Sequence, residues 1–182
     1  MNNFKLISYL IVFILILLML FGSKKVRLNI IFLYQVKVFE NAKNGKISIW
    51  DITCFVLFPI ILSILLVFEF KIIVDRSLSM TFTTVFSFIF TVLFGFAGIL
   101  AGRKQTNENL EDEVAREAFI TISFTNILSL ISMILSIIIS QIENVNFIKK
   151  ILSVSIFSIS FMIIMLLIMI TKRICILYVE GK

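Results

Sequence analysis

Long uncharged apolar runs, separated by short polar stretches, dominate the pattern of this chain. A helix needs roughly 20 apolar residues to cross the hydrocarbon core of a bilayer, and the runs have about that length. The pattern therefore predicts an all-α fold, a polytopic transmembrane helical bundle with about five spans, or four if the first run does not pack with the others. The runs are 6–23, 52–74, 81–102, 118–142 and 151–171.

The first run, 6–23, also has to be weighed as a signal peptide. Only Lys5 is basic before it, whereas three basic residues follow it closely, and no small-residue cleavage site of the Ala-x-Ala type ends it. This charge asymmetry favours an uncleaved helix whose N-terminus lies outside the cell. We therefore expect residues 1–23 to form the first transmembrane helix.

Residues 24–50 form a basic segment before the second run. Its middle part, 26–39, is rich in Ile, Leu, Phe and Tyr with basic residues interspersed, which is typical of an amphipathic helix that lies in the membrane interface. A tilted extension of the first helix, or a buried connector, fits the same pattern, and these interpretations stay open. Trp50 stands where an interfacial aromatic anchor is expected.

Residues 51–182 are predicted to form a four-helix transmembrane bundle. Pro59 lies in the first half of its first helix and is expected to kink it. The charged linker 103–117 carries several acids where the next helix begins, and the helix dipole favours acids at that end. Apolar residues at helical spacing continue back into this linker. A single helix of roughly 33 residues, ~50 Å long, is therefore expected to project beyond the bilayer.

The distribution of Lys and Arg predicts the orientation of the bundle. With the N-terminus outside, the inner segments hold 12 of the 17 basic residues and the outer segments hold five. Basic residues gather in cytoplasmic loops, so the C-terminus is expected in the cytoplasm of a cell whose plasma membrane the chain crosses several times.

Two predicted helices carry a continuous stripe of small or hydroxylated residues at steps of three and four. In lipid, such a face allows another backbone to approach closely. One stripe, in 81–102, is Thr84, Ser87, Thr91, Gly95, Gly98 and Gly102, and the other, in 118–142, is Thr121, Thr125, Ser129, Ser132, Ser136 and Ser140.

These stripes have two interpretations. One is helix packing, in which hydroxyl groups bond back to the carbonyl one turn earlier. The other is the polar lining of a pore in an oligomer. Packing is preferred, because hydroxyl-rich packing faces are common in membranes. It places the two helices against each other or against their symmetry mates, so a homo-oligomer is expected.

Glu69 is the candidate intramembrane acid. It stands between two phenylalanines in an apolar run, and ionisable groups inside a membrane are costly and often functional. It also lies close to the outer end of its span, where Lys71 can share its polar environment. A plain interfacial acid is therefore the competing interpretation.

The composition excludes several kinds of chemistry. Histidine is absent, which removes His-ligated haem, the usual zinc sites and His-based acid–base catalysis. The sequence has no phosphate-binding loop, nucleophile elbow or paired-cysteine motif, and Cys54 and Cys175 are interpreted as small hydrophobic residues. We expect no catalytic residue, no cofactor and no metal, and hence no enzyme. The net charge of +6 is attributed to loops facing anionic lipid rather than to nucleic acid.

The span 81–102 ends in FGFAGILAGRK, and EVAREAFITISF follows after the charged linker. Over about half of the chain, this pattern resembles small multi-pass membrane components of bacterial phage-defence and abortive-infection systems. The resemblance implies a self-associating membrane effector or anchor that works with a soluble cytoplasmic partner, and a bacteriocin-immunity membrane protein would look much the same. The partner would meet the basic loop 24–50 or the acidic linker 108–117. A small transporter or channel subunit, with Glu69 or the hydroxyl stripe as its site, is the alternative.

Overall fold

The computed structural model describes residues 11, 28–39, 48–102, 109–142 and 147–180, and every regular element within them is helical. Two short segments, η1 and η2, have the wider hydrogen bonding of a π-helix. In chain order the elements are α2 (Leu28–Val38), α3 (Ile49–Ile52), η1 (Thr53–Leu57), α4 (Phe58–Ile64), η2 (Leu65–Glu69), α5 (Arg76–Gly102), α6 (Asn109–Ser140) and α7 (Phe147–Glu180).

Among the described residues, four helices are long and apolar enough to cross a membrane. They are Ile49–Glu69, Arg76–Gly102, Asp112–Ser140 and Phe147–Tyr178. This confirms the predicted all-α fold with several membrane-spanning helices. The first predicted span, 6–23, lies outside the described residues apart from Ile11.

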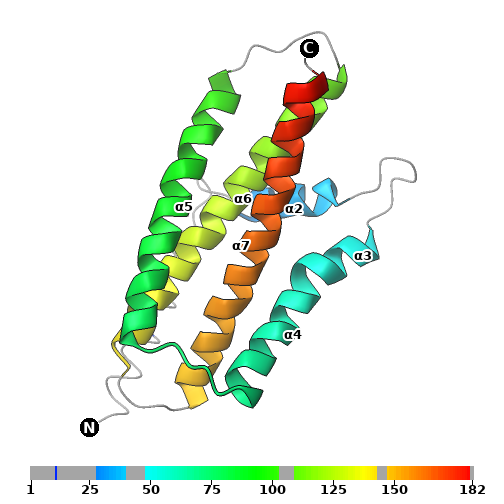
Figure 1. Ribbon diagram of the computed structural model, residues 1–182. Coiled ribbons are helices and arrows are strands. Elements are labelled where there is room, and N and C mark those ends of the chain that lie inside the picture. Colours follow the sequence, from blue (N-terminus) through cyan, green and yellow to red (C-terminus); the bar gives the residue numbers. More distant parts are fainter. Residues whose placement is uncertain (1–10, 12–27, 40–47, 103–108, 143–146, 181–182) are drawn as a thin grey trace.

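The long helices pack side by side in the order α5, α6, α7, α4, and each runs antiparallel to its neighbour (Figure 1). The helix α6 is the centre of the bundle, because 56% of its apolar part is buried, against 11% for α5. The short helix α2 contacts α6 and lies across it rather than alongside it (Figure 1). The outer helix α5 therefore leaves most of its surface free.

Apolar side chains from all four long helices make the core. The ring of Phe82 on α5 meets the ring of Phe157 on α7 edge to face, with centroids 5.7 Å apart. Nearer the other end, Leu93, Ile122 and Ile170 join α5, α6 and α7 in a second cluster. All three helices are therefore held together along their length.

Several helix ends differ from the predicted ones. The helix expected over 52–74 ends at Glu69, α5 begins at Arg76 rather than 81, and α7 continues to Glu180 rather than ending at 171. The predicted helix was too long because the residues after Glu69 are apolar. Val74 is one of them, and its side chain is buried in the connection between two helices rather than in a membrane span. Its N–H donates to the hydroxyl of Ser153 at 3.1 Å, which ties this connection to α7.

Pro59 sits at the start of α4, directly after the π-helical segment η1. The N–H of Phe58 donates to the carbonyl of Thr53, five residues back, so the turn before the proline is wide. A proline in a helix lacks an N–H and its ring crowds the carbonyl four residues earlier. A wide turn relieves that crowding, so the disturbance expected at Pro59 takes the form of a π-helical turn.

Candidate functional site

The stripe of small residues on α5 faces away from the bundle. Its six members, Thr84, Ser87, Thr91, Gly95, Gly98 and Gly102, are all exposed. A Cβ atom added at any of the three glycines would meet none of the described residues within 4 Å. The buried residues of α5, among them Phe86 and Leu93, lie about half a turn away on the helix. The stripe and the packing face of α5 are therefore on opposite sides.

The hydroxyl groups of this α5 stripe do not need a partner from outside the helix. Thr84 donates to the carbonyl of Met80 at 3.1 Å, and Thr91 donates to that of Ser87 at 2.9 Å. Such back-bonding allows a threonine to face lipid or another helix without leaving an unpaired donor. Phe88 and Phe94, which are 69% and 66% exposed, stand beside the stripe. The result is a flat band of small residues next to large side chains.

The stripe on α6 has the opposite environment. Ala118, Thr121, Thr125, Ser129, Ser132 and Ser136 are buried inside the protomer, and Ser140 is half-buried. The hydroxyls of Thr121, Thr125 and Ser129 each donate to the carbonyl four residues earlier. In the described part of the chain, other side chains cover this stripe, as they do on a packing face, and the hydroxyls of Ser132 and Ser136 have no hydrogen-bond partner there.

The two stripes lie on different sides of the contact between α5 and α6 over most of its length, and meet only at one end, where Thr84 and Ser140 line a common pocket. At one end of their contact, the hydroxyl of Ser79 on α5 donates to the carbonyl of Ser136 on α6. Ser79 belongs to the buried side of α5, with Phe86 and Leu93. The helices α5 and α6 thus pack against each other, and the described residues leave the α5 stripe exposed.

A polar contact that the sequence did not reveal joins α6 to α7. Nη2 of Arg173 lies 3.0 Å from Oε2 of Glu117, and Nη1 of Arg173 donates to the hydroxyl of Thr121 at 2.8 Å. The Arg173 side chain is only 12% exposed. One hint of this contact was visible in the sequence, because the acid Glu117 stands one helical turn before the hydroxyl of Thr121. Nothing in the sequence identified Arg173, 56 residues further along the chain, as the partner of Glu117.

Glu69 lies at the end of its helix, as the last residue of η2, and it is exposed. Its neighbours Phe68 and Phe70 are exposed as well. An acid that serves a transport path is expected to face the interior of the bundle or a water-filled cavity. The position of Glu69 favours the plainer interpretation of an interfacial acid at a helix end.

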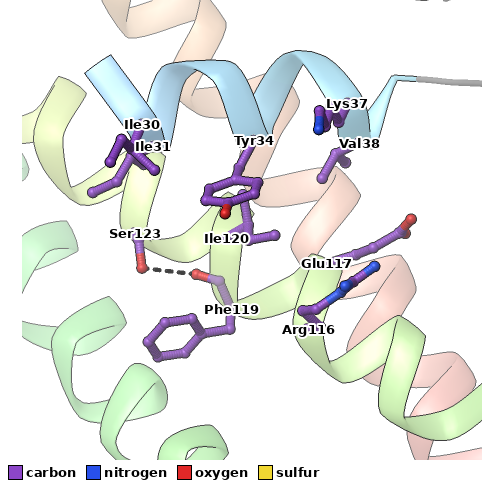
Figure 2. A pocket seen from close by; sticks show the side chains of 10 residues that line it. All are labelled: Ile30, Ile31, Tyr34, Lys37, Val38, Arg116, Glu117, Phe119, Ile120 and Ser123. Carbon is purple, nitrogen blue, oxygen red and sulfur yellow. Dashed lines mark hydrogen bonds between the residues drawn. The ribbon is translucent and has the colours of Figure 1, made fainter. Parts of the chain in front are cut away.

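Between α2 and α6 the surface is hollowed into a recess of about 530 Å³ (Figure 2). The two helices meet beside it through Phe32 and Phe124, whose rings lie edge to face with centroids 4.9 Å apart. Tyr34 of α2 and Ile120 of α6 line the middle of the recess (Figure 2). Since α2 lies across α6 and exposes Tyr34, its placement favours the interfacial helix among the interpretations of 24–50.

In the part of the chain that the structure describes, no cluster of side chains is suited to bind a metal ion. There, no three His, Cys, Asp or Glu side chains come close enough to hold an ion. Cys54 and Cys175 are both free thiols, one half-buried and the other exposed. The chain matches no protein-family model, no curated protein and no solved structure. The function has to be argued from the helix faces and the recess described above.

Proposed function

We propose that this protein is a non-enzymatic integral membrane component that self-associates through the exposed stripe of α5. We propose that it acts as an oligomeric effector or anchor in bacterial defence or immunity, as the resemblance of its sequence pattern suggests. The observation that supports self-association most directly is the empty space around Gly95, Gly98 and Gly102. A face with no Cβ atoms on its glycines, turned away from its own bundle, suits a second helix in lipid.

The position of α5 supports the same proposal. It is an outer helix, and only 11% of its apolar part is buried inside the protomer. Two copies related by a two-fold axis along the membrane normal would present the same stripe to each other, which is the commonest symmetry of protein dimers. Gly98 and Gly102, spaced by four residues, would then lie where the two backbones approach most closely.

The buried state of the α6 hydroxyls bears on the kind of effector. Ser129, Ser132 and Ser136 are covered within the protomer, so a water-filled path along them would require the bundle to open. The proposed role is therefore association between helices rather than conduction through a single protomer. A membrane leak, if one is triggered, would form between copies. The soluble partner would meet the cytoplasmic side at 24–50 or 108–117, with the N-terminus outside and the C-terminus inside.

Substitution of Gly98 by leucine tests the proposal. The Cβ of the new side chain meets none of the described residues within 4 Å, and the side chain occupies the face offered to a second copy. Native mass spectrometry of the purified protein is expected to show an oligomer for the wild type and a monomer for Gly98→Leu, with unchanged helix content by circular dichroism. Thr171→Leu is the matched control, because Thr171 is exposed on α7 and its substitution is expected to leave the oligomer intact.

Two results would overturn the proposal: a monomeric wild type, or a Gly98→Leu variant with the wild-type oligomer. Measuring the membrane potential with a dye, in cells with controlled expression of the protein, distinguishes the effector role from the anchor role. Depolarisation by the wild type that Gly98→Leu abolishes indicates an effector that opens a leak. An intact potential with an intact oligomer indicates an anchor.

The alternative, a small transporter or channel subunit, draws less support from the geometry. Glu69 is exposed at a helix end, and the α6 hydroxyls are packed. If the chain is a transporter with Glu69 as its site, Glu69→Gln is expected to lose solute flux, whereas the proposal above predicts no flux that depends on Glu69. A loss of flux in Glu69→Gln would favour the transporter instead.

A further inference from the structure

The recess between α2 and α6 has a distinct distribution of polar and apolar groups. At one end it is lined by Ile30 and Ile31 of α2 and by Phe119 of α6 (Figure 2). At the other end Lys37 of α2 and Arg116 of α6 reach its rim (Figure 2). A ligand that fits this recess needs an apolar body and a charged end.

The charged end is positive. Lys37 and Arg116 are both exposed, and no ion pair is recorded for either within the described residues. Glu117 also lines the recess, but its carboxylate is paired with Arg173 at 3.0 Å. Among the described residues that line the recess, two cations therefore remain to attract an anion, and the acid among them, Glu117, is already paired with Arg173 on α7.

The position along the helices fits the boundary of a bilayer. Arg116 lies seven residues after the first residue of α6, and Ile120 lies one turn further along the helix. The ion pair of Glu117 and Arg173 lies at the level of Arg116 and marks a polar layer there. The apolar part of the recess continues from this layer toward the membrane-spanning part of α6.

We propose that this recess binds an anionic phospholipid. Its phosphate lies between Lys37 and Arg116, and one acyl chain lies against Ile30, Ile31 and Ile120. Basic pockets beside membrane helices favour anionic headgroups, and each cation near the surface contributes about 1 kcal/mol to this preference. The apolar wall adds affinity that a water-soluble anion cannot gain. The site is independent of the proposed self-association, since no residue of α5 lines it.

Native mass spectrometry with added lipids tests the proposal. The lipids are anionic phosphatidylglycerol and zwitterionic phosphatidylcholine with the same acyl chains, so that only the headgroup differs. The wild type is expected to bind phosphatidylglycerol about 30-fold more tightly. The double variant Lys37→Gln/Arg116→Gln is expected to lose this preference. The control Lys71→Gln/Arg76→Gln also removes two exposed cations, but at the opposite end of the bundle, and is expected to retain the preference.

A second variant tests the apolar part of the site. Ile120→Trp fills the recess and is expected to weaken both lipids about equally, while circular dichroism shows unchanged helix content. Excess inorganic phosphate is expected not to displace phosphatidylglycerol from the wild type. Equal binding of the two lipids by the wild type, an undiminished preference in the double variant, or displacement by phosphate alone would each overturn the proposal. If Ile120→Trp fails to fold, the charge variants decide the question.

Discussion

Arg173 and Glu117 form an ion pair that joins the last helix to the central one. Nη2 of Arg173 lies 3.0 Å from Oε2 of Glu117, and Nη1 donates to the hydroxyl of Thr121 at 2.8 Å. Thr121 in turn donates to the carbonyl of Glu117 at 2.8 Å. The guanidinium, the carboxylate and the hydroxyl thus satisfy one another at the end of the bundle where the recess lies.

Removing the cation of this pair is expected to destabilise the bundle. Arg173→Leu leaves the partly buried Glu117 carboxylate without its partner, and stranding one member of such a pair costs about 1–3 kcal/mol. Unfolding in detergent, followed by circular dichroism, is expected to show a lower midpoint. The second substitution in Arg173→Leu/Glu117→Leu is expected to recover part of the loss, because no unpaired charge then remains.

The neighbouring cation provides the control. Lys172 is exposed on the same turn of α7, and Lys172→Leu is expected to shift the midpoint by less than about 0.5 kcal/mol. An Arg173→Leu variant as stable as Lys172→Leu would contradict the structural role given to the pair.

The two stripes are expected to respond oppositely to larger side chains. Ser132 has no accessible surface, so Ser132→Leu forces extra volume into a packed core and is expected to destabilise the protomer by about 1–3 kcal/mol. Thr84→Leu adds similar bulk on the exposed face of α5 and is expected to leave the protomer's unfolding midpoint unchanged. Thermal unfolding of both variants at a protein concentration where the chain is monomeric separates these outcomes. A tolerated Ser132→Leu would indicate that the α6 stripe faces a wet path after all.

The spans themselves could be predicted because an apolar run is a property of consecutive residues. The stripes were visible for the same reason, since helical spacing alone defines them. Spacing does not say what covers a face, however. The stripe of Gly98 and the stripe of Ser132 look alike in sequence, yet one is exposed and the other is buried, because α5 is an outer helix and α6 the central one.

The remaining features depend on residues that are distant in sequence or on backbone geometry. The contact of Arg173 with Glu117 requires the end of α7 to return to the start of α6, and no local pattern encodes that pairing. The recess requires α2 to lie across α6, which the sequence left open among several placements. The end of the helix at Glu69 was missed because Lys71, rather than glycine, adopts the left-handed conformation there.

Gln35 offers a stabilising substitution. Its side chain is 2% exposed on α2, and among the described residues neither its amide oxygen nor its amide nitrogen has a hydrogen-bond partner. A buried polar group without a partner costs about 1–3 kcal/mol, so Gln35→Met is expected to raise the unfolding midpoint. Gln141→Met is the control, because Gln141 is exposed and its substitution is expected to change little. A destabilised Gln35→Met would show that the amide of Gln35 binds a group from outside the described residues.

Lys71 ends the second long helix in a conformation that glycine adopts more easily. Its φ is 55°, in the left-handed region where glycine commonly ends a helix, and the N–H of Ile72 donates to the carbonyl of Leu66 at 3.0 Å, one residue further back than in the usual glycine cap because η2 is π-helical. A side chain with a Cβ costs about 1 kcal/mol in this region, and glycine avoids that cost. Lys71→Gly is therefore expected to raise the unfolding midpoint, although the greater freedom of glycine in the unfolded chain offsets part of the gain. Lys71→Ala keeps the Cβ while it removes the charge, so it is expected to be no more stable than the wild type. If the alanine variant gained as much as the glycine variant, the charge of Lys71 rather than its backbone would be the source of the strain.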